Sequence, residues 1–276
     1  MWMDPKTTML LVVTSLVLMT CVMGGSQKKG FAMSNYNYRC QDIDAIHNVV
    51  WWYDWKQTPS EHHKANCTNT LNERNRVPMV WGWRHKTDYP MWFRNDTSRY
   101  VLGFNEPNHR GQSNLTPQEA AVAWRELQAR ADRQNQLLVS PAAIKCTSGS
   151  DKCMMPGVQW FTEFFQACHG CRVDYLATHM YTCDIDHVMD FLHELYTRFH
   201  RKIWLTEVAC PTHSYSHALA YMKDLLAKLE AADHVYRYSW YSSRVRGGGA
   251  ATHEDSLMHT SDSTFTTLGS YYFNFM

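Results

Sequence analysis

The strongest constraint on the fold is an alternation between short apolar runs and longer segments with helical patterning. Eight such runs, bounded by turn or polar residues and rich in Val, Leu, Ile, Trp and Tyr, lie at 30–33, 49–55, 77–81, 100–104, 137–142, 173–181, 202–208 and 235–240. Their lengths are those of strands. Several are continuously apolar, as expected of parallel strands that are covered on both faces.

Helical segments are expected between these runs. Thr116-Pro117-Gln118-Glu119 has the features of a helix start, with Thr116 as the N-cap, Pro117 at the first position and Glu119 three residues after the cap. Further apolar stripes at helical spacing occur at 159–167, 188–199 and 217–231. Strands alternating with helices predict a parallel sheet, and eight units in roughly 250 residues suit a single-domain α/β fold, the (β/α)₈ TIM barrel. A doubly wound open sheet is the alternative, disfavoured because no Gly-rich nucleotide-binding loop is present.

The first 25 residues are interpreted as a secretory signal peptide. Lys6 precedes an apolar run at 9–22, which small residues follow. This run is shorter than the roughly 20 residues that a membrane-spanning helix needs, so an anchor is the less favoured alternative. Residues 26–276 are then the barrel domain of an extracellular protein without membrane contact. The formal net charge of +1 argues against a nucleic-acid partner, and we expect a monomer.

The cysteines fit export. Nine are present, and removal of Cys21 with the signal leaves an even number, which suggests disulfides. Sequence proximity favours the pairs Cys146–Cys153, Cys168–Cys171 and Cys183–Cys210. A redox or metal motif at 168–171 is the alternative for the second pair, although a second ligand pair for zinc is missing. Glycosylation triplets begin at Asn66, Asn95 and Asn114.

Two glutamates stand where a barrel of this kind has its active site, at the carboxyl ends of the strands. Asn105-Glu106-Pro107 follows the fourth run, and Glu207 lies near the end of the seventh. Cleavage of a glycosidic bond needs two carboxyl groups, one protonated and one ionised. Asn105 is placed to bind a sugar hydroxyl. The alternative is that Glu106 is a loop acid before a proline and that Glu207 pairs with a basic neighbour such as Arg172 or Arg201.

Aromatic residues near the strand ends add a second indication, because sugar rings stack on aromatic faces. We expect substrate contacts from Trp55, Trp81, Tyr181 and Trp240, with part of the tryptophan set filling the core. His179, at the end of the sixth run, either contacts a catalytic carboxylate or lies in the barrel wall. We expect neither a metal nor a cofactor, since a mechanism with two carboxylates needs none.

Several blocks of the chain resemble the glycosyl hydrolase catalytic core of glycoside hydrolase family 128, which includes the fungal alkali-sensitive linkage proteins. The blocks are Val77-Pro78-Met79-Val80-Trp81-Gly82, Leu102-Gly103-Phe104-Asn105-Glu106-Pro107-Asn108, Gln112-Ser113-Asn114-Leu115-Thr116-Pro117, Leu138-Val139-Ser140-Pro141-Ala142 and Ile203-Trp204-Leu205-Thr206-Glu207. The resemblance implies a TIM barrel, retaining action on β-1,3-glucan, an acid/base at Glu106 and a nucleophile at Glu207.

The chain departs from this family's pattern at two positions. Met180 stands between His179 and Tyr181 where a Trp is common, and Asp54 stands before Trp55 where an Asn is frequent, which adds a charge near the cleft. The leading hypothesis is a retaining endo-β-1,3-glucanase. The alternatives are a non-catalytic glucan-binding or wall protein on the same barrel, and a hydrolase of another β-glycan.

Overall fold

The computed structural model describes residues 25–34, 36–58, 75–83, 98–146, 151–247 and 249–276. The expected signal segment falls almost entirely outside these ranges, as do the triplets at Asn66 and Asn95. Within the described ranges, no helix combines the length and the apolarity that a bilayer crossing requires.

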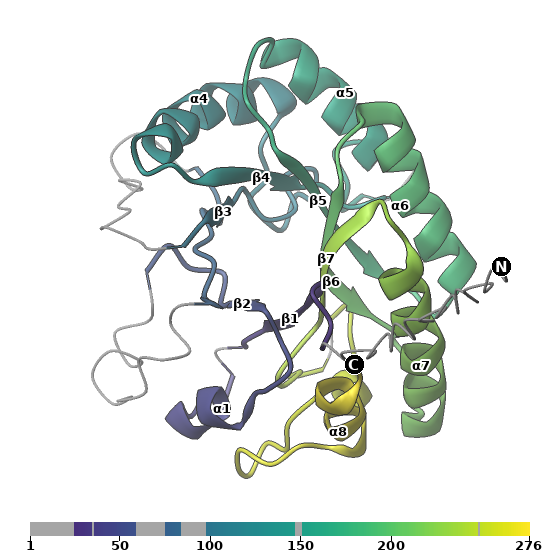
Figure 1. Cartoon of the computed structure of the whole chain (residues 1–276). Coiled ribbons are helices and arrows are strands. Elements are labelled where there is room, and N and C mark those ends of the chain that lie inside the picture. Colours follow the sequence, from purple (N-terminus) through teal and green to yellow (C-terminus); the bar gives the residue numbers. More distant parts are fainter. Residues whose placement is uncertain (1–24, 35, 59–74, 84–97, 147–150, 248) are drawn as a thin grey trace, which may run out of the picture.

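Seven parallel strands form one curled sheet in the order β2-β1-β7-β6-β5-β4-β3 (Figure 1). The strands are β1 (Lys29–Ala32), β2 (Trp51–Tyr53), β3 (Tyr100–Leu102), β4 (Leu137–Ala142), β5 (Tyr175–Tyr181), β6 (Ile203–Ala209) and β7 (Val235–Trp240). Each coincides with one of the apolar runs, and the α/β barrel class predicted from the alternation is confirmed.

The remaining predicted strand, at 77–81, is not a regular strand. Arg76 forms an isolated bridge with Trp52 of β2, and Met79 forms one with Leu102 of β3. The segment therefore lies where the predicted strand was expected, between the two edge strands of the sheet. Pro78 explains the irregularity, because it lacks an N–H and can only accept, from the Leu102 amide at 2.9 Å. We refer to residues 76–81 as the seam of the barrel.

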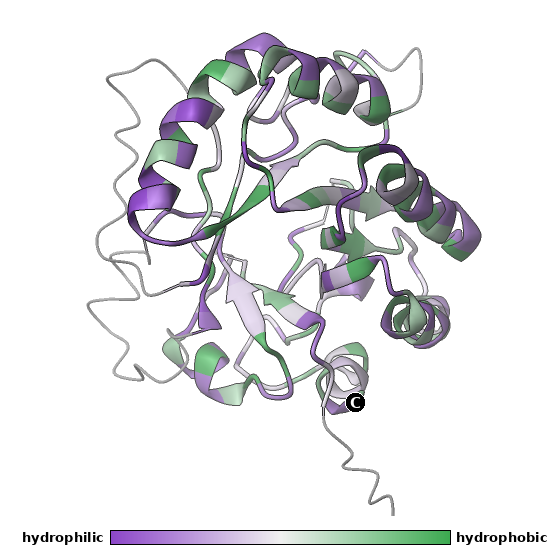
Figure 2. Cartoon of the chain, turned by 45° about the horizontal axis from the view of Figure 1, so that its top comes forward, coloured by the Kyte–Doolittle hydropathy of each residue, from purple (hydrophilic) through white to green (hydrophobic). Residues whose placement is uncertain are grey.

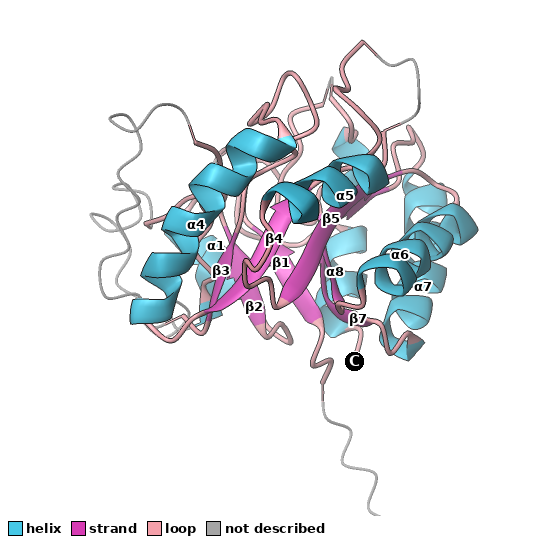
Figure 3. Ribbon diagram, turned by 90° about the horizontal axis from the view of Figure 1, so that it is seen from above, coloured by secondary structure: helices cyan, strands magenta, loops and turns pink. Residues whose placement is uncertain are grey.

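Helices cover the outside of the sheet (Figure 3). They are α1 (Cys40–Ala45), α4 (Pro117–Arg133), α5 (Gly157–Ala167), α6 (Ile185–Phe199), α7 (Tyr215–Ala231) and α8 (Thr267–Asn274), with a 3₁₀ turn η2 (His253–Asp255). The predicted start of α4 is confirmed, since the Glu119 amide donates to the Thr116 hydroxyl at 3.2 Å and the Thr116 amide to the Glu119 carboxylate at 2.9 Å. The short helices α1 and α8, of six and eight residues, were not predicted.

The apolar side chains form two layers. One lies between the strands and the helices, where Trp124, Trp160 and Phe164 are fully buried. The other fills the barrel, with Trp51, Tyr53 and Trp204 among its members. In Figure 2 the outer helices carry both hydrophobic and hydrophilic residues around their circumference, as expected of helices with one buried face.

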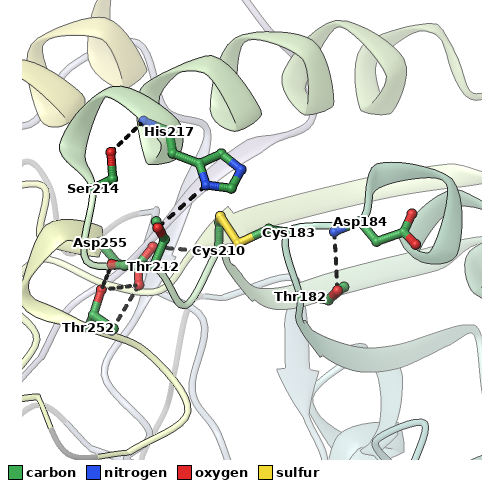
Figure 4. Close-up of a disulfide and its surroundings, with 9 residues drawn as sticks. All are labelled: Thr182, Cys183, Asp184, Cys210, Thr212, Ser214, His217, Thr252 and Asp255. Carbon is green, nitrogen blue, oxygen red and sulfur yellow. Dashed lines mark hydrogen bonds between the residues drawn. A yellow bond between two sulfur atoms is a disulfide. The ribbon is translucent and has the colours of Figure 1, made fainter.

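Three predicted disulfides are present: Cys146–Cys153, Cys168–Cys171 and Cys183–Cys210. The second leaves no thiolate at 168–171 to bind a metal. The third ties the residues that follow β5 to those that follow β6, beside the first turn of α7 (Figure 4). Two of the three therefore fasten loops at the carboxyl ends of the strands.

Candidate active site

The carboxyl ends of the strands surround a cavity of about 920 Å³. Of the eight residues predicted from the sequence to act or bind here, seven line it: Trp55, Trp81, Asn105, Glu106, His179, Tyr181 and Glu207. They come from widely separated parts of the chain, and the parallel arrangement brings their strand ends to one edge.

Trp240 is the exception, and its predicted place in the cavity is wrong. Its side chain is fully buried outside the barrel, where the ring packs 6.2 Å from that of Tyr221 and Nε1 donates to the Asp255 carbonyl oxygen at 2.9 Å. Successive side chains along a strand point to opposite faces. The next residue, Tyr241, lines the cavity instead. The phase of β7 decides which of the two residues faces the cavity, and the register of its pairing with β6 is irregular, so the sequence alone does not report that phase.

Glu106 lies in the turn that follows β3. Its φ of 40° is in the left-handed region, which costs a residue with a side chain of order 1–3 kcal/mol and persists only where the surroundings hold it. The buried Asn108 supplies this support. Its side chain accepts from the Ile144 amide at 3.0 Å and donates to the carbonyl oxygens of Ile144 at 2.9 Å and Met155 at 3.1 Å. The turn is thereby fixed to the loop after β4.

Glu207 lies within β6, and its carboxylate is surrounded by donors. Trp55 Nε1 donates to Oε1 at 2.7 Å, and the Tyr181 hydroxyl donates to Oε2 through a short hydrogen bond. The Tyr53 hydroxyl lies 3.2 Å from Oε1 and 3.0 Å from the Thr206 carbonyl oxygen, so its single proton is shared. Tyr53, which is not among the site residues predicted from the sequence, is thus part of the site.

His179 lies between the two carboxylates. It is the register partner of Glu207 on the neighbouring strand, and its Nδ1 lies 2.8 Å from Glu106 Oε1 and 3.4 Å from Glu207 Oε2. One oxygen of Glu106 and one of Glu207 lie within 4.8 Å of each other. The sequence left open whether His179 contacts a carboxylate of the site or lies in the barrel wall. The structure shows contact with both carboxylates.

Burial shifts the protonation equilibria of this cluster. Removal from water raises the pKa of Glu207, and so does the charge of Glu106, while His179 and the hydrogen bonds from Tyr181 and Trp55 act in the opposite direction. Burial alone lowers the pKa of His179, but the two carboxylates outweigh it and the pKa is raised above its usual 6.5. The two carboxylates therefore favour the protonated form of His179.

The alternative partners of Glu207 are engaged elsewhere. Arg172 forms ion pairs with Asp132 and Asp174, and Arg201 donates to backbone carbonyl oxygens. Asp54, the added charge expected near the cleft, is held by Arg76 at 2.7 Å and does not line the cavity. Its charge is thus compensated within the wall.

Further residues shape the cavity. Met180 and Tyr241 line it, and Asn105 Nδ2 donates to Gln112 Oε1 at 3.1 Å. Asn105 Oδ1 is buried without a hydrogen-bond partner among the described residues, so it remains available to a ligand hydroxyl. The carboxylates and His179 are also close enough together to hold a metal ion. The expected absence of a metal and of a cofactor stays a prediction.

The chain was compared with known proteins. The family model described as the glycosyl hydrolase catalytic core matches residues 30–272. Alkali-sensitive linkage protein 1 of Schizosaccharomyces pombe is 29% identical over 167 residues, which are 58% of this chain and 30% of that protein. The chain thus matches less than a third of the length of this curated relative.

Solved structures agree with the family model. A family 128 subgroup II endo-β-1,3-glucanase from Sorangium cellulosum is 30% identical with a TM-score of 0.75, covering 90% of this chain and 98% of that one. One from Pseudomonas viridiflava is 26% identical with a TM-score of 0.73, covering 91% and 98%. This chain belongs to glycoside hydrolase family 128, within the glycosyl hydrolase catalytic core.

Proposed function

We propose that the chain is a retaining glycoside hydrolase that cleaves β-1,3-glucan, with Glu106 as the acid/base and Glu207 as the nucleophile. The observation that carries this proposal is the approach of their oxygens to within 4.8 Å. Carboxyl groups about 5–5.5 Å apart suit direct attack on the anomeric carbon, whereas inverting enzymes leave about 6.5–9.5 Å for a water molecule.

The hydrogen bonds support the division of roles. Trp55 Nε1 can only donate, and with the Tyr181 hydroxyl it favours an ionised Glu207, as a nucleophile requires. Glu106 contacts His179 through Oε1, which leaves Oε2 for the proton that the leaving oxygen receives. Once Glu106 is protonated, its charge no longer raises the pKa of Glu207. In the second step Glu106 takes a proton from the attacking water.

The substrate is proposed from the relatives together with the cavity. Both endo-β-1,3-glucanases named above are more than 25% identical to this chain, which favours endo cleavage. Trp55 and Trp81 offer faces for sugar stacking, and Asn105 Oδ1 an acceptor for a hydroxyl. We also propose that the protein is extracellular, since disulfides persist in oxidising compartments. The expected monomeric state stays a prediction.

The test is hydrolysis of laminarin by the unmodified chain beside Glu207→Gln and Glu106→Gln, with Glu126→Gln on the exposed face of α4 as the matched control. We expect oligosaccharides from the unmodified chain and the control only. Proton NMR of the first products should show the β anomer, and early release of several product sizes would indicate endo cleavage. An α anomer would contradict retention. Binding of laminarin without any product would favour the glucan-binding protein, and activity on a different β-glycan alone would change the substrate.

A further inference from the structure

The charged residues that line the cavity are not limited to the two glutamates. Apart from Glu106 and Glu207, every charged side chain among the described lining residues is cationic: Lys145, Lys152 and Arg246. His109 and His187 line the same cavity. The non-catalytic part of the site therefore has a positive character that the overall net charge of +1 does not predict.

Two of the cations lie in one fastened loop. Lys145 and Lys152 each directly precede one cysteine of the Cys146–Cys153 disulfide, in the segment between β4 and α5. The Lys145 ammonium lies 5.2 Å from the centre of the Phe191 ring. The Lys152 carbonyl oxygen accepts from the Arg110 amide at 2.7 Å, which ties the loop to the turn after Glu106. The loop that carries the two lysines is thus held at the cavity.

The third cation comes from the loop that follows β7. The Arg246 guanidinium lies 4.8 Å from the centre of the Tyr36 ring, and Tyr36 also lines the cavity. Among the described residues, no carboxylate lies within ion-pair distance of Lys145, Lys152 or Arg246. These charges are consequently not neutralised by ion pairs within the described parts of the fold.

The largest shifts in the pKa of Glu207 come from the burial of its carboxyl group and from His179, Glu106, Tyr181 and Trp55, and none of the three cations is among these. Charges of one sign in a cleft raise the local concentration of a ligand of the opposite sign. We propose that the outer part of the cavity binds anionic groups, carboxylates or sulfate esters, so that the preferred substrate is an acidic β-glucan. This inference rests on the proposed function, because it assigns the substrate class of the same site.

The experiment measures binding, so that it does not depend on turnover. Full-length Glu207→Gln protein is titrated calorimetrically with three oligosaccharides of equal length: neutral laminarihexaose, the same chain partly oxidised to carboxylates at C6, and the same chain O-sulfated. The cavity variant adds Lys145→Gln, Lys152→Gln and Arg246→Gln. The matched control instead adds Arg133→Gln, Lys202→Gln and Lys223→Gln, three exposed cations that do not line the cavity.

We expect at least one acidic chain to bind more tightly than the neutral chain. The ratio of acidic to neutral affinity should fall about tenfold in the cavity variant and stay constant in the control, since three exposed charge contacts are each worth up to about fivefold. The advantage should vanish near 1 M salt, where the Debye length is about 3 Å. The oxidised and sulfated chains show which anion is preferred.

Equal affinity for the neutral and both acidic chains would overturn the inference while leaving the glucanase proposal intact. An unchanged ratio in the cavity variant would overturn it as well. If the unmodified chain releases no sugar from laminarin, the proposed function fails, and the binding ratio is still measurable. Should Glu207→Gln not fold, competitive inhibition of the unmodified chain by the same oligosaccharides gives the same ratio.

Discussion

The mouth of the barrel, at the carboxyl ends of the strands, and its base, at their amino ends, contain the same kinds of aromatic residue. The two ends differ in what the polar atoms of these residues contact. At the mouth, Trp55 and Tyr181 donate to the carboxylate of Glu207. At the base, the hydroxyls of Tyr100 and Tyr236 contact each other at 2.6 Å, and the Tyr175 and Tyr236 rings stack with centroids 4.3 Å apart. The mouth therefore places aromatic donors around a buried carboxylate. At the base, the aromatic residues pack against one another and against the Arg237 guanidinium, which lies 5.3 Å from the centre of the Tyr236 ring.

Aromatic residues at one end of a barrel therefore do not by themselves identify that end as the active site. Burial raises the pKa of Tyr181 well above 10, and the nearby carboxylates add to the effect, so the hydroxyl remains a donor. Trp204 at the base is fully buried with a ring 5.1 Å from that of Tyr100. Variants at the mouth should consequently alter turnover, and variants at the base should alter the free energy of unfolding.

The largest effect is expected from Glu106→Gln at the mouth. Loss of the proton donor should lower kcat on laminarin by roughly 10²–10⁴-fold, while the melting temperature does not fall, because the variant removes a charge from a buried cluster. Stopped assays of reducing sugar and thermal melts check both values. A variant with a lowered melting temperature and an unchanged specific activity would contradict the expectation that residues at the mouth serve turnover.

Trp204→Ala should have the opposite profile. Deletion of this ring at the base should cost about 3–5 kcal/mol of unfolding free energy, a decrease of roughly 10 °C in melting temperature for a chain of this size. Denaturant titration measures the loss. The kcat at 20 °C should stay within about threefold of the unmodified chain, and a larger fall would mean that the base positions the mouth.

Removal of one tyrosine hydroxyl at each end of the barrel tests the same difference between mouth and base. Tyr181→Phe removes a donor to Glu207 and should lower kcat by about tenfold, the value of a hydrogen bond to a charged group. Tyr236→Phe removes a hydroxyl that contacts Tyr100 at the base and should leave kcat unchanged. Kinetics of the two purified variants on one substrate suffice. Equal effects would remove the distinction between the ends.

The smallest effect is a displacement of the pH profile by His179→Gln. The positive charge of His179 lowers the pKa of Glu207, against the burial that raises it. Without that charge the pKa of Glu207 rises further, so ionisation of the nucleophile requires higher pH, and the acidic limb of kcat/KM should move upward. Profiles from pH 3 to 8 test this. A limb that moves downward would show that His179 does not act on Glu207 by charge.

Much of the arc from β4 to β7 was predictable, because its strands and helices carry clear apolar periods and α4 begins with a capping box. The two glutamates were predictable because strand ends meet at one edge. Less predictable were features that depend on register. The outward face of Trp240, the inward face of Tyr241 and the contact between His179 and Glu207 follow from strand phase and a bulge in β5–β6 pairing. The Arg76 ion pair that compensates Asp54 joins residues on different segments, and no local pattern reports it.

The seam has a consequence for the order in which amide hydrogens exchange with solvent. Residues 76–81 connect β2 to β3 through isolated bridges, so these amides should open at lower free energy than those of β5 and β6. Trp81 at the end of the seam and Trp55 after β2 both line the cavity. An oligosaccharide that stacks on both indole rings would span the connection between β2 and β3. Its binding should therefore slow amide exchange at residues 76–81 more than anywhere else in the sheet.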